Sequence, residues 1–404
     1  MNSYFRIFST WLVIFLVGLK VYSASQGRIW VSENLETSLN WFPNYSEGLL
    51  NLNERILEEN LNEKAVQKLK INSAKALKRA PLSYRPFLYL AEANVFWNQN
   101  DVARGLFLEA NARNTRSRHA LRGLSILSIK EQDYKVAVEN LDVLLRLKGQ
   151  QEHLDSYQQA LTSLSPIPQA REAIDGLLSV RPPWGAKYLF NQIALMNERN
   201  FSDVSESLEI YTGSPDVNKR EEKLNAAYLM KLKRMNKLEE AYRYWEELFG
   251  TQGQNAILYN SEFEKSPALP PFNWIEIDRP KYFSEIDKEG GLYASFRDNE
   301  ARALTEQLLR LKPGSFYRMS VDAEWSYRQR QGVFNWIITC LQNKTVISEV
   351  NLDDKAKKNS GGEHTFQVPV IGCSHQNIRL VAKAGQYSKR IWSRTNSVNL
   401  ERVE

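Results

Sequence analysis

Few residues of this 404-residue chain have the types and spacings that catalysis or metal binding requires. Its histidines are His119, His153, His364 and His375. None of them pairs with another at ligand spacing on a helix. Acidic pairs such as Glu221-Glu222 are adjacent in sequence, whereas a glycosidase needs two carboxylates that face each other across the scissile bond. A glycine-rich phosphate loop, a G-x-S-x-G elbow and an H-E-x-x-H motif are all absent. We therefore expect no catalytic residue, no metal site and no cofactor.

The cysteines are Cys340 and Cys373, and neither belongs to a CxxC or Cys/His spacing, which argues against zinc. Both lie near stretches that alternate like strands. A disulfide between them would close a loop of about 32 residues and stabilise the fold by about 3–4 kcal/mol, through the unfolded state. We expect this disulfide in an exported protein, and two buried free thiols are the alternative.

The most basic short stretch contains four arginines: Arg113, Arg116, Arg118 and Arg122. Such a patch is suited to an acidic protein partner, an anionic polysaccharide or lipid headgroups. A solvated helix start is the alternative. Over the whole chain 53 basic and 47 acidic residues nearly balance, and the net charge of +6 is evenly spread. This even distribution argues against a nucleic-acid partner.

Aromatic rings are frequent after Gly250, and such rings stack on the C–H faces of sugars. Trp274 lies in a proline-rich segment and Tyr327 lies in the polar turn 326–332, so these two are the candidate glycan-stacking residues. Most of the other rings are expected in a core, because one side of each strand faces inward.

A membrane-targeting segment is expected at the N-terminus. Residues 7–19 are uncharged and mostly apolar, between Arg6 and Lys20. Read more widely, residues 4–24 would form a helix of ~31 Å, the thickness of a bilayer core. Residues 1–27 are therefore interpreted as a signal anchor or a cleaved signal peptide, and residues 28–44 as a linker. A helix buried in a soluble domain is the remaining alternative.

Small residues recur between residues 45 and 250 at intervals of 33 to 37 residues. The series is Ala103, Ala137, Ala170, Val204 and Ala241, with Ala76 preceding Ala110 by 34 residues. Large apolar residues follow four positions later, as at Phe107 and Leu141. This is the two-helix register of a tetratricopeptide repeat, in which stacked hairpins share one core. The pattern predicts an α-solenoid over 45–250 with a concave surface for protein partners.

After Gly250 the apolar period changes from 3.6 to 2, which indicates strands. The expected strands are 292–297, 304–311, 315–325, 333–341, 346–352, 364–370, 378–384 and 397–403. Seven or eight strands in about 150 residues are typical of a two-sheet sandwich. The fold class is thus multidomain, α then β, with an antiparallel β-sandwich over 251–404.

Two segments carry a family resemblance. Residues 258–264 (LYNSEFE) with 271–274 (PFNW) resemble the opening of carbohydrate-binding-module-like jelly rolls, and 307–317 is similar to their Q-x-L-x-L-x-P-G-x-Y segment. Ser261 and Glu262 replace the usual Gly and Asp, so no structural calcium is assigned. The whole chain, with its Arg-Pro-Pro-Trp element at 181–184, resembles a group of bacterial membrane-anchored tetratricopeptide proteins, some associated with exopolysaccharide production.

These expectations combine into a non-enzymatic scaffold or adaptor at the bacterial inner membrane, with its bulk in the periplasm. The solenoid would recruit envelope proteins, in exopolysaccharide assembly or export, and the sandwich would contact exopolysaccharide. One alternative is a carbohydrate-binding protein that acts through the sandwich, and another is a polysaccharide hydrolase. If the leader is cleaved, the protein is periplasmic or secreted.

Overall fold

The computed structural model describes residues 39, 45–58, 61–147, 151–213, 219–249, 257–264, 269–287, 290–326, 333–352, 362–383 and 390–403. The expected membrane segment 7–19 lies outside this range, as does the linker apart from Leu39. Among the described residues, no helix is both long and apolar enough to cross a membrane. The chain forms two compact units, Met1–Tyr188 and Leu189–Glu404.

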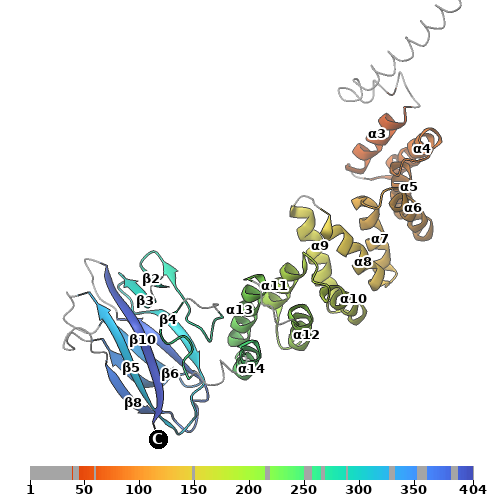
Figure 1. Cartoon of the computed structure of the whole chain (residues 1–404). Coiled ribbons are helices and arrows are strands. Elements are labelled where there is room, and N and C mark those ends of the chain that lie inside the picture. Colours follow the sequence, from red (N-terminus) through yellow and green to blue (C-terminus); the bar gives the residue numbers. More distant parts are fainter. Residues whose placement is uncertain are drawn as a thin grey trace, which may run out of the picture. The chain divides into compact units, whose positions relative to one another are not determined.

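The first unit consists of helices joined by short turns (Figure 1). They are α3 (Ser46–Glu58), α4 (Glu63–Arg79), α5 (Arg85–Phe96), α6 (Asn100–Arg113), α7 (Arg118–Lys130), α8 (Tyr134–Arg146), α9 (Gln151–Leu164) and α10 (Pro168–Leu178). Helix α11 (Gly185–Leu195) crosses into the second unit. Consecutive helices pack against each other, α3 on α4, α5 on α6 and α7 on α8. From α5 to α13, alternate helices begin 33 or 34 residues apart, and α14 begins 37 residues after α12, which confirms the predicted helical repeat.

The turns inside the hairpins repeat as well. Asn98 between α5 and α6 and Gln132 between α7 and α8 lie 34 residues apart, and both are left-handed, with φ of 56° and 61°. In the first of these turns Gln99 N donates to Asn94 O at 2.9 Å, a bond that closes the end of α5. Asn236, with φ of 60°, occupies the same place in the last hairpin. Three of the hairpins thus reverse direction through a left-handed residue two positions before their second helix.

The predicted repeat positions lie where helices touch. Ala76, Ala103, Ala110, Ala137 and Ala170 are all fully buried. Only a methyl group fits where two helix backbones approach closely, while the neighbouring large residues fill the space between hairpins. The small residues of the repeat are therefore packing positions, as their spacing predicted.

The second unit holds three further helices and ten strands within the described residues. The helices are α12 (Phe201–Thr212), α13 (Lys219–Arg234) and α14 (Leu238–Phe249). The strands are β1 (Asp278–Arg279), β2 (Tyr282–Ile286), β3 (Leu292–Phe296), β4 (Arg302–Leu309), β5 (Phe316–Trp325), β6 (Phe334–Cys340), β7 (Val346–Asn351), β8 (Glu363–Gln367), β9 (Gln376–Ala382) and β10 (Ile391–Val403).

The strands form two antiparallel sheets, which confirms the predicted α-then-β order and the sandwich (Figure 1). One sheet has the order β1-β2-β3-β10-β5-β8 and the other β4-β9-β6-β7. The chain changes sheet at most of its connections, as in jelly rolls. A single cluster of buried residues from both sheets, among them Phe296, Trp336 and Leu380, fills the space between them.

The sequence analysis missed strands β1 and β2. Strand β1 has only two residues and is followed by Pro280, and β2, between β1 and β3, has only one fully buried residue and so shows weak apolar alternation. Strand β10 also begins at Ile391 rather than at 397, because a bulge between Thr395 and Ser397 interrupts the apolar alternation.

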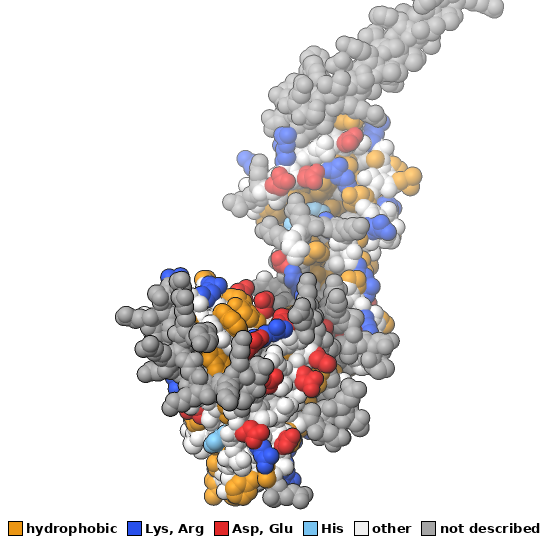
Figure 2. Space-filling model, turned by 60° about the vertical axis from the view of Figure 1, so that its left-hand side comes forward, with side chains coloured by type: hydrophobic (Ala, Val, Ile, Leu, Met, Phe, Trp, Pro, Cys, Tyr) orange, Lys and Arg blue, Asp and Glu red, His pale blue; other side chains and the backbone are white. Residues whose placement is uncertain are grey.

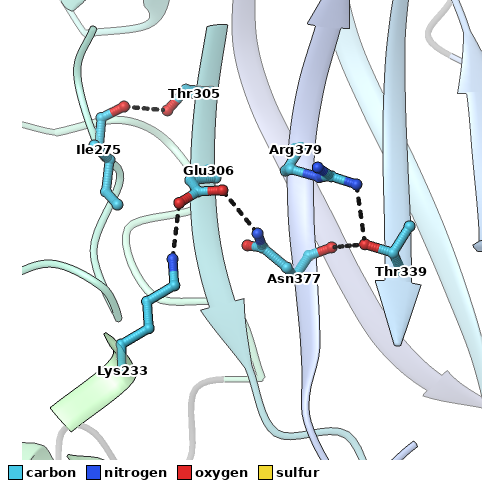
Figure 3. Close-up of polar contacts among 7 residues, drawn as sticks. All are labelled: Lys233, Ile275, Thr305, Glu306, Thr339, Asn377 and Arg379. Atoms are coloured by element: carbon cyan, nitrogen blue, oxygen red, sulfur yellow. Dashed lines mark hydrogen bonds and ion pairs between the residues drawn. The ribbon is translucent and has the colours of Figure 1, made fainter. Parts of the chain in front are cut away.

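Helix α13 is bonded to the four-stranded sheet (Figure 3). Lys233 Nζ donates to Glu306 Oε1 of β4 at 2.7 Å, and Asn377 Nδ2 of β9 donates to Glu306 Oε2 at 2.8 Å. Burial acts to raise the pKa of Glu306, but the Lys233 ammonium, the Asn377 amide and the Arg379 guanidinium together outweigh it, and the pKa lies below its ordinary value. The Glu306 carboxylate is therefore a fixed link between helix and sheet.

Aromatic rings of α14 extend this contact. Trp245 packs on Phe272 and Tyr259, with ring centroids 5.2 and 5.6 Å apart, and Tyr242 packs on Phe272 at 5.6 Å. The last helix ends at Phe249, and the first described strand begins at Asp278. The last helices nevertheless belong to the same compact unit as the sandwich.

Candidate functional site

A cavity of about 420 Å³ lies between the first helices of three successive hairpins, α3, α5 and α7. Its floor is apolar, with Leu88, Phe107 and Leu127, and Ile126 is exposed at its wall. We call this cavity the repeat groove. Charged residues of both signs line it, namely Glu54, Glu58, Arg85, Glu92 and Arg122, and His119 lies beside them. An apolar floor with charges on its walls is suited to a segment of protein that inserts an apolar side chain.

The polar groups of the repeat groove hold one another in place. Arg85 donates to Glu54 Oε2 at 2.9 Å and to Tyr89 Oη at 3.3 Å. Burial raises the pKa of the Glu92 carboxyl, and the Arg122 guanidinium partly opposes this shift. Burial also raises the pKa of the Tyr89 hydroxyl, which therefore keeps its proton at neutral pH. The groove thus offers a hydroxyl, guanidinium groups and carboxylates at fixed places.

Gly123 lets α7 approach the floor of the groove. A Cβ at this position would lie 2.4 Å from the Phe107 ring. Gly123→Ala should destabilise the first unit by about 1–3 kcal/mol, because the buried ring has to move. Gly105→Ala on α6 is the matched control, with no atom within 4 Å of the added carbon, and should gain about 0.5–1 kcal/mol from helix propensity. Thermal unfolding measures both; equal melting temperatures would refute the close approach.

The structure separates the four arginines of the basic stretch into different surroundings. Arg113 pairs with Glu109 on its own helix, and its guanidinium lies 4.0 Å from the centroid of Phe87. Arg116 is exposed in the turn before α7, and Arg118 is half-buried at the start of that helix. Arg122 lines the repeat groove. One of the four residues therefore joins the groove.

Trp274 does not fit the predicted role in glycan stacking. Its side chain is only 3% exposed, and its ring packs on Phe263 at 5.0 Å and on Trp336 at 5.4 Å. The indole Nε1 donates to Asn260 O at 2.8 Å. The proline-rich segment folds onto the sandwich core and carries the ring inward. Tyr327, the other candidate, lies outside the described residues.

Cys340 and Cys373 form a disulfide, with Cα atoms 4.9 Å apart. Both are buried, at the end of β6 and in the loop before β9. The bond therefore ties two loops at one end of the sandwich.

A row of half-exposed rings lies on the solvent side of the six-stranded sheet. Phe283 of β2 and Tyr293 of β3 have centroids 5.8 Å apart, and Trp392 of β10 stacks on Tyr293 at 6.2 Å. These strands are neighbours in the sheet. The alternate residues of β3, such as Leu292 and Phe296, face the core, so Tyr293 faces outward. We call Phe283, Tyr293 and Trp392 the aromatic row.

Charged groups border the aromatic row. The Arg390 guanidinium lies 5.6 Å from the Phe283 centroid, and Arg394 pairs with Asp287 at 2.8 Å. Burial raises the pKa of the Tyr293 hydroxyl, which remains a hydrogen-bond donor at neutral pH. Flat apolar rings beside polar groups can stack on one face of a sugar and bond its hydroxyls.

Sequence reasoning counted Tyr293 and Trp392 among the many aromatic residues but did not single them out, and it passed over Phe283. Alternation along β3 shows that Tyr293 and Leu292 face opposite sides. It does not show which side is the core, and nothing local brings residue 392 beside residue 293. The row therefore depends on strand pairing between distant segments.

Among the described residues, no group of three or more His, Cys, Asp or Glu side chains is placed to hold a metal ion.

No protein-family model and no curated protein matches the chain. Among solved structures, it is similar to a CBM4 protein at 15% identity and a TM-score of 0.28, over 36% of this chain and 99% of that one. It is also similar to PilF of Pseudomonas aeruginosa, at 14% identity and a TM-score of 0.29, over 52% of this chain and 94% of PilF. It is similar as well to the MamA protein, at 13% identity and a TM-score of 0.23, over 64% of this chain and 97% of MamA. Likenesses of this size leave activity, ligand and partner open.

Proposed function

We propose that this protein is a non-enzymatic scaffold that binds a segment of a protein partner in the repeat groove. The observation that carries the proposal is the groove itself, an apolar floor enclosed by the first helices of three hairpins with charges of both signs on its walls. We further propose that residues 1–27 hold the chain at the bacterial inner membrane, with its bulk in the periplasm, where it serves exopolysaccharide assembly or export. The buried disulfide supports an oxidising compartment.

Ile126 is the best position to test this proposal, because it lines the groove and its side chain is exposed. A photocrosslinking amino acid at 126 in the full chain should give a discrete adduct with one protein in cells. The same amino acid at Val102, equally apolar and exposed on α6 but outside the groove, should give none.

Glu92→Lys provides a second check in the same cells. It should reduce the 126 adduct several-fold, because it reverses the charge beside Arg122. Adducts of equal yield from positions 126 and 102 would contradict the groove as the binding site. Fractionation of the same cells with protease added to spheroplasts tests the proposed anchoring and orientation.

Carbohydrate binding by the sandwich is a second candidate function, and the aromatic row is the observation that favours it. Three rings from adjacent strands present a continuous apolar strip beside Arg390. The strip is suited to a chain of sugars rather than to a single ring. In this case the sandwich would hold exopolysaccharide while the repeat groove holds a protein.

Trp392→Ala tests this second function. Titration calorimetry of the full chain with a neutral oligosaccharide (cellohexaose) and an acidic one (oligogalacturonate) should detect binding. Trp392→Ala should weaken this binding about tenfold or more, since covering a large apolar side chain contributes ~1.5–3 kcal/mol. Trp97→Ala, a half-exposed tryptophan of the first unit, is the matched control and should bind like the native chain. No heat with either sugar would exclude these ligand classes.

A further inference from the structure

Three loops meet at one end of the sandwich: 310–315 after β4, 341–345 after β6 and 368–375 after β8. The disulfide Cys340–Cys373 links the second and third loops. Gly314 N donates to Val368 O at 2.9 Å and Val368 N donates to Ser315 O at 3.0 Å, which links the first and third. This end of the sandwich is therefore a braced surface, and we call it the tied end.

The tied end presents apolar side chains to solvent. Val370 is 73% exposed and Ile371 87% exposed, side by side at the tip of the third loop. Phe316, which pairs with Gln367 at the start of β5, is exposed on the same end. Figure 2 shows apolar side chains gathered at the lower end of the sandwich, where Figure 1 places the C-terminus. Aliphatic residues at such exposure on a braced loop serve no packing purpose within the chain.

The loops of the tied end carry basic side chains, and the Glu239 carboxylate of α14 contacts them at Arg310 and His375. Lys312 and Lys344 are exposed in the first two loops. Arg310, at the base of the first loop, pairs with Glu239 of α14 at 3.1 Å. None of the three loops contains Asp or Glu. The apolar tip is therefore flanked by two lysines and by no loop carboxylate.

We propose that the tied end is a membrane-contact surface, in which Val370 and Ile371 enter the headgroup layer of an anionic bilayer while Lys312 and Lys344 bind its phosphates. Lysine is depleted in protein–protein interfaces, whereas lysines beside a bilayer are attracted to anionic lipid. An apolar tip as exposed as Val370 and Ile371 is also suited to insertion into a lipid surface. This surface is distinct from the repeat groove and from the aromatic row, and the proposal does not depend on what either of them binds.

Vesicle binding by the full chain tests the proposal. The chain is first reconstituted in nanodiscs of phosphatidylcholine. Its N-terminal apolar segment then has a neutral bilayer of its own and is not available to the vesicles added later. The nanodiscs are then mixed with vesicles of phosphatidylcholine containing roughly 30% phosphatidylglycerol, or of phosphatidylcholine alone, and co-flotation is measured. We expect flotation with the anionic vesicles, about tenfold or more above that with the neutral ones and above empty nanodiscs.

Two variants locate the contact. Ile371→Asp and the pair Lys312→Gln/Lys344→Gln should each lower binding to the anionic vesicles by about tenfold or more. Leu82→Asp is the matched control, since Leu82 is an equally exposed aliphatic residue, 88% exposed, in a turn of the first unit. It should bind like the native chain. Ile371 and Leu82 both lie at the surface, so Ile371→Asp and Leu82→Asp should fold. Melting temperatures close to that of the native chain would confirm this.

Either of two results would overturn the proposal. One is flotation that does not distinguish anionic from neutral vesicles, or that Ile371→Asp leaves unchanged. The other is the absence of flotation with anionic vesicles, and a photocrosslinked protein adduct at position 371 in cells would then identify the tied end as a protein-binding surface.

Discussion

Trp274→Ala will lower the free energy of unfolding of the second unit by about 3–5 kcal/mol, the range for a buried tryptophan truncated to alanine. The ring is 3% exposed and lies between Phe263 and Trp336. Its removal leaves a cavity and also frees Asn260 O from its bond with the indole Nε1. A ring that stacked on sugar would be exposed, and its loss would barely change stability.

Trp392→Ala is the matched control for this prediction, because it removes the same side chain from the aromatic row. It should cost less than about 1.5 kcal/mol, mainly the stacking on Tyr293. Urea unfolding of the full chain, followed by hydrogen exchange of peptides from β3, β6 and β10, measures both variants in the same unit. A stable Trp274→Ala variant would mean that the ring does not belong to the core.

Removal of the disulfide, by the double variant Cys340→Ala/Cys373→Ala, should destabilise the sandwich by about 3–4 kcal/mol. The cysteines are 33 positions apart, and the unfolded chain regains the entropy of a loop of that length. Both side chains are buried, so a small packing loss adds to the effect. Hydrogen exchange in β6 and β9 should increase most, because the bond joins the segments beside these strands.

A reductant separates the covalent bond from the packing change. Dithiothreitol should lower the melting temperature of the native chain and leave that of the double variant unchanged. If the native chain melts at the same temperature with and without reductant, the loop-closure contribution is negligible. Unit 1 contains no cysteine and serves as the internal reference.

Features that repeat regularly along the chain, or that follow from residue type alone, were predictable from the sequence. The alanines 34 residues apart, the strand alternation after Gly250 and the disulfide are all found in the structure. Each depends on local periodicity or on the residue type alone. A helix places every third or fourth residue on one side and a strand every second, so apolar spacing reports the element directly.

The binding surfaces depended on the tertiary structure. The repeat groove combines Glu54, Glu92 and Arg122 from three hairpins, and the aromatic row combines rings from residues 283 to 392. Alternation says that a strand has two faces but not which one is buried. Trp274 was predicted to be exposed because it lies in a proline-rich segment, and only the packing of that segment on the sandwich shows that the ring is buried. The choice of face and of neighbouring strand follows from how all the apolar surfaces of a unit are buried together. The sequence by itself determined the elements and their repeat, while the packing of distant segments decided which side chains remain free to bind.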